Sequence, residues 1–250
     1  MKQKNMVTKL LGVSALAMMM ALFCGLLLPV TGHADDVPPA VGSTENTTVV
    51  KPYTPANPDR FLRLTVKQTG PKINLKWDRM AEASAYKIYG GYTGESMKCL
   101  KTIRDNKVNA ATLKKMNKML IERTRVFKFK LLAYQNVNGQ EVLMVKSPAV
   151  YVAGSQHPSY TNVKKLKVAK QNFTLAAGQK AKIKASVTRE RKKKKFLPSI
   201  CGPKVSYFSS NKSVATVDGS GNITAVAPGN CTVFVYAVNG TCKRVLLTVQ

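Results

Sequence analysis

The segment Ser209–Gly229, SSNKSVATVDGSGNITAVAPG, constrains the fold more than any other part of this chain. It contains two short runs rich in β-branched residues, Val214–Val217 and Ile223–Val226. Asp218–Gly221 lies between them and concentrates residues that tolerate positive φ or hydrogen-bond their own backbone, so it predicts a tight turn. Pro228-Gly229 predicts another turn after the second run. The segment therefore predicts two short strands separated by turns.

The same segment resembles the signature of bacterial Ig-like domains of the Big2 group, in which an "SSN…VATV…G.I.A…G" run forms the middle of a small sandwich. The resemblance implies a module of a secreted bacterial surface protein. Such modules hold, space or bind, and they do not normally catalyse. The resemblance does not imply any particular ligand.

The N-terminus has the pattern of a secretion signal. Lys2, Lys4 and Lys9 precede an apolar run, and small residues before position 35 suit cleavage after Ala34. We therefore expect residues 1–34 to be a signal peptide. Because the apolar run is longer than an ordinary signal, an uncleaved membrane anchor is the alternative.

Residues 35–57 are rich in Pro, Thr and Val and show no periodicity, which predicts a disordered leader. The mature protein is expected to be secreted or associated with the cell wall.

Several later segments alternate polar and apolar residues, as half-buried strands do. Lys72–Trp77, Ala85–Tyr89 and Phe127–Leu131 are clear examples, and Gly90-Gly91 is expected to end the second of them. Asn138-Gly139 predicts a tight hairpin. These segments indicate an antiparallel β-sandwich.

Two stretches, INLKWDRMAEASAYKIYGG and VFKFKLLAYQNVNGQEVLMVKSPAVYVA, resemble a fibronectin type III domain over residues 58–154. The resemblance implies that Trp77 and Tyr86 pack in the core. Phe127 stands where the family usually has its tyrosine-corner residue, and we expect Phe127 and Phe129 to belong to the structural core as well.

Residues 112–120, TLKKMNKML, are more helix-prone than the usual link in that family. Leu113, Met116 and Leu120 fall at helical spacing, so we expect them to plug the open end of the sandwich. The alternative is an amphipathic turn that touches a membrane.

Residues 155–160 form a short linker, and residues 161–250 are expected to be the Big2 Ig-like sandwich. Lys180–Val187 alternates almost perfectly, with Ala181 and Ile183 among the core-facing residues and lysines facing solvent. Asn239-Gly240 predicts a two-residue hairpin. The expected fold class is all-β, with two consecutive Ig-like or fibronectin III-like antiparallel β-sandwiches after a signal peptide and a flexible leader.

The chain carries 40 Lys and Arg against 12 Asp and Glu, a formal net charge of +28 at pH 7. A field of that sign attracts polyanions, and the nearest ones for a secreted bacterial protein are wall polymers, anionic lipids and host glycans. Nucleic acid is not expected, because no recognition helix or RNA-binding signature is visible.

The densest cluster of charge is RERKKKK, which we expect to be a loop at one end of the second sandwich. The candidate polyanion contacts are its six cations, Arg189, Arg191, Lys192, Lys193, Lys194 and Lys195. The alternative is a solvated, mobile loop without a ligand.

Four cysteines follow the signal: Cys99, Cys201, Cys231 and Cys242. A two-residue hairpin would place Cys242 opposite Ala237, and Cys231 would then lie about 20 Å away along the strand. That distance argues against a Cys231–Cys242 bridge. Cys201 and Cys242 are expected at the same end of the sandwich, so they are the candidate disulfide, and reduced thiols are the alternative.

The sequence predicts no catalytic, cofactor-binding or metal site. His33 and His157 are the only histidines, and the acids are scattered, so no acid–base pair or activated nucleophile can be assembled. The leading hypothesis is a non-catalytic secreted or envelope-associated binding or adhesion protein whose cationic sandwiches contact anionic wall polymer or host glycan. The alternatives are a structural spacer or subunit with a surface protein as partner, and an accessory module of a separate enzyme. A membrane partner is expected only if the N-terminal apolar segment is uncleaved.

Overall fold

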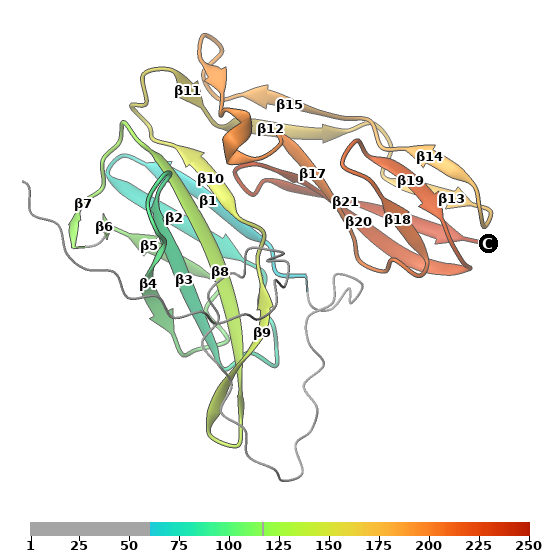
Figure 1. Ribbon diagram of the computed structural model, residues 1–250, viewed down its shortest axis with the longest axis horizontal. Helices are drawn as coiled ribbons and strands as arrows, with labels where there is room; N and C mark the ends of the chain where they lie inside the picture. The colour runs from blue at the N-terminus through green and yellow to red at the C-terminus, as the bar shows by residue number, and fades with distance from the viewer. Residues whose placement is uncertain (1–60, 117) are drawn as a thin grey trace, which may run out of the picture. The chain divides into compact units, whose positions relative to one another are not determined.

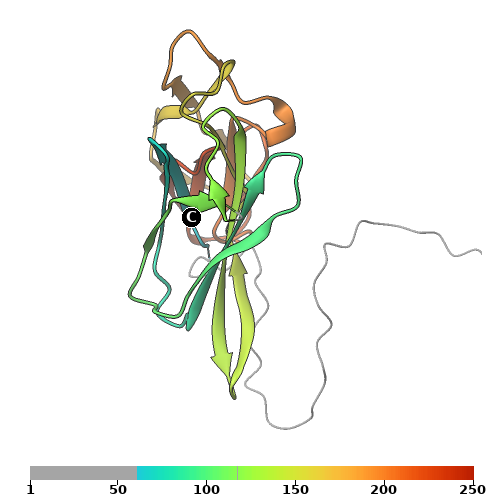
Figure 2. The ribbon, with the colours of Figure 1, turned by 90° about the vertical axis from the view of Figure 1, so that its left-hand side faces the viewer.

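The computed structural model describes residues 61–116 and 118–250. The predicted signal peptide and leader lie outside the described residues. The described residues all belong to one compact unit. Nearly all the regular structure is β-strand, as Figures 1 and 2 show. Within the described part of the chain, no helix is long and apolar enough to cross a membrane.

The first sandwich is built from strands β1 to β10, and its two sheets are antiparallel. One sheet has the order β1-β2-β5, and the other has the order β10-β8-β3-β4, with β9 also paired to β8. The strands are β1 (Leu64–Thr69), β2 (Lys72–Trp77), β3 (Ala85–Tyr92), β4 (Lys98–Ile103), β5 (Ala110–Leu113), β6 (Lys115–Met116), β7 (Met119–Leu120), β8 (Val126–Val137), β9 (Gln140–Lys146) and β10 (Val150–Ala153).

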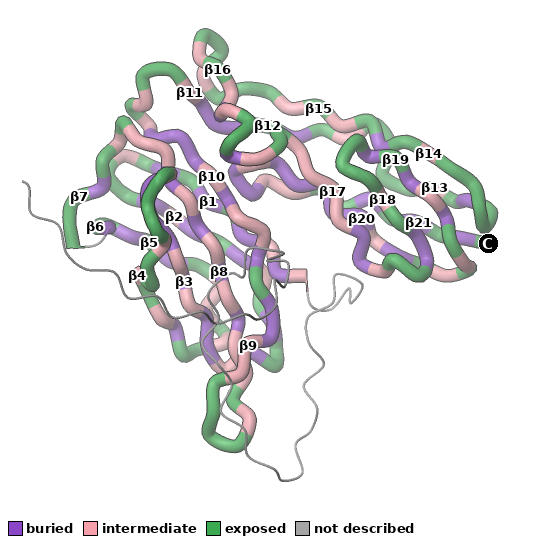
Figure 3. Tube along the Cα trace, viewed as in Figure 1, coloured by how far each residue is buried: buried purple, intermediate pink, exposed green. Residues whose placement is uncertain are grey.

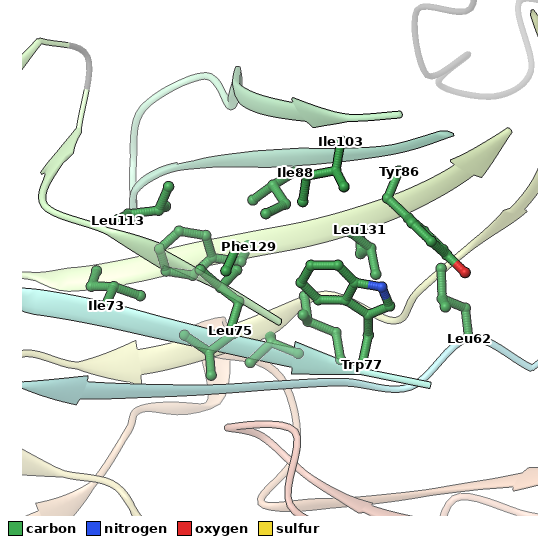
Figure 4. Close-up of a cluster of buried hydrophobic side chains, with 14 of the residues drawn as sticks. Leu62, Ile73, Leu75, Trp77, Tyr86, Ile88, Ile103, Leu113, Phe129 and Leu131 are labelled. Carbon is green, nitrogen blue, oxygen red and sulfur yellow. The ribbon is translucent and has the colours of Figure 1, made fainter. Parts of the chain in front are cut away.

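The core of the first sandwich fills the space between its two sheets (Figure 4). Trp77, Tyr86, Phe127 and Phe129 are each at most 2% exposed. The Tyr86 hydroxyl accepts a hydrogen bond from the Met80 amide at 2.7 Å, so the polar end of this buried side chain is satisfied. Burial of these rings gives the sandwich its largest apolar contribution.

Strand β3 does not end at Gly90-Gly91 but continues to Tyr92. A Cβ atom at Gly90 would lie 2.5 Å from the Phe129 ring and 2.8 Å from Leu100 Cδ1. Glycine is therefore required there by a close approach inside the sheet, not by a turn. The expected strand end was wrong because the pattern of one strand does not show which side chain lies beneath it.

The segment expected to be helix-prone forms strands instead. Leu113 ends β5 and pairs with Ile73 of β2, and the hairpin β6–β7 follows. Lys118 in its turn has a φ of 69°, which a right-handed helix cannot contain. Leu113 and Met116 are buried as expected, but Leu120 is 75% exposed, so it does not plug the sandwich.

The second sandwich is built from strands β11 to β21, and it buries a separate apolar core. Its main sheet has the order β13-β21-β20-β17, and a smaller sheet has the order β14-β19-β18. Most pairs are antiparallel, but β13 runs parallel to β21, and β11 runs parallel to β16. The strands are β11 (Tyr160–Thr161), β12 (Val163–Val168), β13 (Asn172–Leu175), β14 (Lys180–Lys182), β15 (Ala185–Arg189), β16 (Lys195–Phe196), β17 (Val205–Ser209), β18 (Ala215–Val217), β19 (Asn222–Ala225), β20 (Gly229–Ala237) and β21 (Cys242–Val249), with the short 3-10 helix η2 (Ser199–Cys201) before β17.

The alternating run Lys180–Val187 is divided between two sheets. Its first part, β14, pairs with β19, and its second part, β15, pairs with β12. The alternation itself holds, because Ile183 is buried and Lys182 and Lys184 on either side are exposed. The chain therefore changes partner near Ile183 without turning its apolar face away from the core.

The hairpin between β20 and β21 has a three-residue loop. Tyr236 opposes Cys242, and the Ala237 amide donates to the Thr241 carbonyl at 2.8 Å. The expected pairing of Cys242 with Ala237 is therefore wrong by one residue. Cys231 opposes Leu247, so it remains far from Cys242 along the sheet.

Tyr236 joins the two sandwiches at the start of β1. Its buried hydroxyl accepts from the Leu64 amide at 2.7 Å and donates to the Leu64 carbonyl. Phe61 stacks on Phe234 with ring centroids 4.2 Å apart. Gly240 has a φ of 85°, and a Cβ there would lie 2.0 Å from the Leu64 carbonyl oxygen, so this approach requires glycine. These contacts form the joint.

We expect Tyr236→Phe to destabilise the chain by about 1–3 kcal/mol, because the Leu64 amide and carbonyl would stay buried without a partner. Urea unfolding followed by circular dichroism measures this cost. Tyr207→Phe is the matched control, since the Tyr207 hydroxyl has no hydrogen-bond partner among the described residues. Equal costs for the two variants would contradict the role given to the joint.

Candidate functional site

The cationic loop that connects β15 to β16 folds back on itself. The Lys194 amide donates to the Arg191 carbonyl at 3.1 Å, which closes the turn. The Arg189 guanidinium donates to the carbonyls of Lys192 at 3.1 Å and Lys194 at 3.3 Å. Arg189 also lies over the Phe196 ring, 5.4 Å from its centroid. One of the six candidate cations therefore stabilises the loop itself.

Arg191 and Lys194 bind the segment that the sequence predicts as the linker. The Arg191 guanidinium donates to the carbonyl oxygens of Gly154, Ser155 and Tyr160, at 3.0, 2.5 and 3.3 Å. Lys194 Nζ donates to the His157 carbonyl. The Arg191 guanidinium therefore uses most of its five N–H donors within the protein, which leaves few donors for a ligand.

Lys192, Lys193 and Lys195 are exposed, and their side chains have no hydrogen bond or ion pair with other described residues. The six candidate contacts of the loop are therefore divided. Arg189, Arg191 and Lys194 hold the loop and linker, whereas these three lysines point their charges to solvent.

A second group of cations lies on the outward face of the neighbouring strands. In the register of β12 and β15, Lys165 opposes Thr188 and Lys167 opposes Ser186. In β14, Lys180 opposes Thr224 of β19. Three of these lysines thus lie opposite residues that carry a hydroxyl group. The exposed lysines of this face are called the cationic strip and are Lys165, Lys167, Lys180, Lys182 and Lys184.

The cationic strip has little opposing charge. Glu190 and Asp218 are the only acids in residues 161–250. Asp218 is occupied by its own turn: hydrogen bonds from Asn222 and Ser220, with the Lys182 charge nearby, lower its pKa. Among the described residues, Arg244 is the only cation of this region in an ion pair, at 3.9 Å from Asp78. The lysines of the strip are therefore available to an external anion.

The first sandwich holds more of its cations in ion pairs. Arg63 pairs with Asp78, Lys87 pairs with Glu141 at 2.5 Å, and Arg125 pairs with Glu95 at 2.6 Å. Lys87 also lies 4.4 Å from the centroid of the Tyr134 ring. Burial, with the neighbouring Tyr89 and Glu141, raises the pKa of Tyr134 to about 12.

The predicted Cys201–Cys242 disulfide is absent, because all four cysteines of the described residues are free. Cys201 packs with Ala153 and Leu197, whereas Cys242 packs against the core of the first sandwich. Strand β20 lies between β17, which follows Cys201, and β21, which carries Cys242. Burial raises the pKa of both thiols.

The described residues contain a single histidine and no cluster of metal-ligating side chains. In residues 61–116 and 118–250, no group of three or more His, Cys, Asp or Glu side chains could hold a metal ion. His157, the one histidine described, contributes Nδ1 as an acceptor for the amides of Ser159 at 3.1 Å and Tyr160 at 3.0 Å. Its ring therefore supports the linker.

Sequence reasoning does not identify Lys165 and Lys167. The sequence signal that could have identified these lysines is the segment VKKLKV. Val163 and Leu166 of this segment are buried, so the lysines between and after them are exposed. The internal role of Arg191 has no such signal, because its partners are backbone carbonyls about thirty residues away in the chain.

Residues 162–246 match the family model of the bacterial Ig-like domain (group 2). The match confirms, for the second sandwich, the resemblance seen in Ser209–Gly229. It covers less than half of the chain, and for residues 58–154 the fibronectin type III resemblance stays a prediction. No characterised protein matches the sequence.

Several solved structures are similar to parts of this chain. Domains 4 and 5 of the S-layer protein SbsC are 19% identical over 48% of this chain and 64% of that one, with a TM-score of 0.30. Pectate lyase PelI from Erwinia chrysanthemi is 14% identical over 47% of this chain and 33% of the enzyme, also with a TM-score of 0.30. The chain thus spans less than two thirds of either structure. Fibronectin(III)-like modules of Clostridium thermocellum CbhA are 13% identical over 75% of this chain and 94% of theirs, with a TM-score of 0.26. TM-scores this low carry no argument about function.

The linker contacts predict a pH-dependent stability. Burial, with the charges of Lys194 and Arg191, lowers the pKa of His157 below its ordinary value of 6.5. The unfolded chain then binds more protons than the folded chain between these two pKa values, so stability falls as the pH decreases through that window. Protonation would also cost the two hydrogen bonds that Nδ1 accepts.

We expect the urea midpoint to decrease between pH 7 and about pH 5.5, above the range in which carboxylates titrate. His157→Asn keeps an acceptor without a titrating group, so its midpoint should stay flat over the same range. A decrease of equal size in both proteins would contradict the assignment.

Proposed function

We propose that this chain is a non-catalytic binding protein of the bacterial cell envelope. Its second sandwich holds an anionic polymer, such as a wall polymer or an anionic glycan, along the cationic strip and on Lys192, Lys193 and Lys195. The observation that supports this proposal is the row of exposed lysines, three of which oppose a Ser or Thr residue and none of which forms an ion pair among the described residues.

The geometry favours a polymer over a small anion. The strip follows strands in which outward side chains repeat every second residue, so its charges are spread along a line and do not converge on one point. An exposed charge–charge contact contributes about 0.2–1 kcal/mol, so several must act together for useful affinity. A polymer can meet them all at once, whereas a single phosphate or carboxylate meets one or two.

The hydroxyl groups beside the lysines add hydrogen bonding to the charge. Thr188, Ser186 and Thr224 each oppose a lysine of the strip. A hydroxyl group can both donate and accept, so these residues suit the phosphate and sugar oxygens of a wall polymer. This combination also supports a place at the cell surface, where such polymers are found.

Removing the strip should weaken polymer binding more than removing the same charge elsewhere. We expect Lys165→Gln, Lys167→Gln and Lys182→Gln together to reduce affinity for purified wall teichoic acid about tenfold at low salt. The control carries Lys107→Gln, Lys146→Gln and Lys212→Gln, which remove three exposed but scattered charges. Isothermal titration at several salt concentrations measures both proteins.

Equal losses in the two triple variants would show that net charge alone attracts the polymer and would contradict a defined surface. Binding that persists in molar salt would contradict electrostatic attachment altogether, because exposed contacts are strongly screened there.

The joint favours a second candidate function, that of a rigid spacer in a surface assembly. Tyr236 and the linker contacts of Arg191 tie the sandwiches together, as a spacer requires. Salt-insensitive copurification with one surface protein supports this candidate, whereas release from cells by high salt supports polymer binding.

A further inference from the structure

The hairpin β6–β7 of the first sandwich exposes two large apolar side chains in succession. Met119 is 73% exposed and Leu120 is 75% exposed. Met116 on the partner strand is 1% exposed, so it anchors the hairpin to the core. Figure 3 shows the exposed residues of β7 in green. Exposing two neighbouring apolar side chains to water at a turn costs free energy unless a partner buries them.

Cations surround these two side chains. Lys114, Lys115 and Lys118 are exposed on the same segment, and Leu120 opposes Lys115, so the two share one face of the ribbon. Lys98 of β4, together with Lys115 and Lys118, lines a hollow of about 510 Å³. These residues, Lys98, Lys114, Lys115, Lys118, Met119 and Leu120, are called the hairpin tip below.

The nearest acid in the sequence does not neutralise the hairpin tip. Glu122 Oε1 lies 3.6 Å from Arg125 Nη1, so its charge is paired. The tip therefore carries one exposed apolar side chain on each face of the hairpin, Leu120 on the face of Lys115 and Met119 on the face of Met116, within a rim of unpaired lysines.

Anionic lipid headgroups complement this arrangement. Lysine stems can lie along the apolar boundary while the ammonium groups reach the phosphates, and each basic residue near an anionic surface adds attraction. The Met119 and Leu120 side chains then enter the region between headgroups and acyl chains. A protein partner is less well matched, because strands of two residues offer no edge for strand pairing.

We propose that the hairpin tip docks on a lipid bilayer that contains anionic lipid, with Met119 and Leu120 inserted at its surface. This contact uses the first sandwich and requires apolar burial, whereas polymer binding uses the lysines of the second sandwich. Each can therefore fail without the other.

The test places a fluorescent reporter at the tip of the full chain. Leu120→Trp is mixed with vesicles of brominated phosphatidylcholine, with and without phosphatidylglycerol. Trp77 is 2% exposed, so it adds a constant background. We expect the emission to shift to shorter wavelength and to be quenched by vesicles that contain phosphatidylglycerol. Adding Met119→Ser should raise the lipid concentration at half-maximal quenching about tenfold, because one large apolar contact is lost.

Two further variants make the result specific. Ile200→Trp places the same reporter at a site that is 81% exposed but lies in η2, and it should not be quenched. Lys115→Gln with Lys118→Gln, added to Leu120→Trp, should also raise the half-maximal lipid concentration about tenfold. Circular dichroism checks that every variant is folded.

Three results would overturn the proposal: no quenching of Leu120→Trp, equal quenching of Leu120→Trp and Ile200→Trp, or equal quenching with and without phosphatidylglycerol. The shared N-terminus cannot produce the expected difference, because both reporters carry it.

Discussion

Burial of every second side chain against a core is the constraint on which the rest of this structure depends. In β2, Ile73, Leu75 and Trp77 fill the first core, which forces the residues between them to face outward. In β12 a register shift between Val163 and Lys165 interrupts the alternation, so Val163 and Leu166 are buried three residues apart and the lysines are still exposed. In a chain with few acids, the outward positions become a cationic surface. Fold and candidate function therefore follow from one periodic pattern.

That pattern explains which parts of the fold could be predicted from the sequence. Lys72–Trp77 forms a strand with the expected bounds, because alternation and turn residues are local signals. The departures at Gly90 and in the loop that contains Gly240 have another origin. Both depend on a distant partner, Phe129 beneath Gly90 and the Leu64 carbonyl beside Gly240. Strand propensity contains no information about such partners.

In the candidate site, too, some features could be predicted from the local sequence and others depend on distant partners. Composition and spacing identify the cations of the loop but not what they bind inside the protein. Arg191 bonds three backbone carbonyls, and no side-chain pattern marks a carbonyl as an acceptor. Lys192 and Lys193, one and two residues away, stay free for a ligand. A run of positive charge therefore combines residues that hold the protein together with residues that can bind something else, and only the backbone path separates them.

The parallel pairing of β13 with β21 has a mechanical consequence. Asn172–Leu175 and Leu246–Val249 run side by side in the same direction, with four residue pairs in register. A pull on the N-terminal end of β13 and the C-terminal end of β21 would load these hydrogen bonds together, in shear, and would not open them one after another. Tension along the chain would therefore meet its resistance in this pair, which would suit the second sandwich to a role in which force reaches it through its last strand.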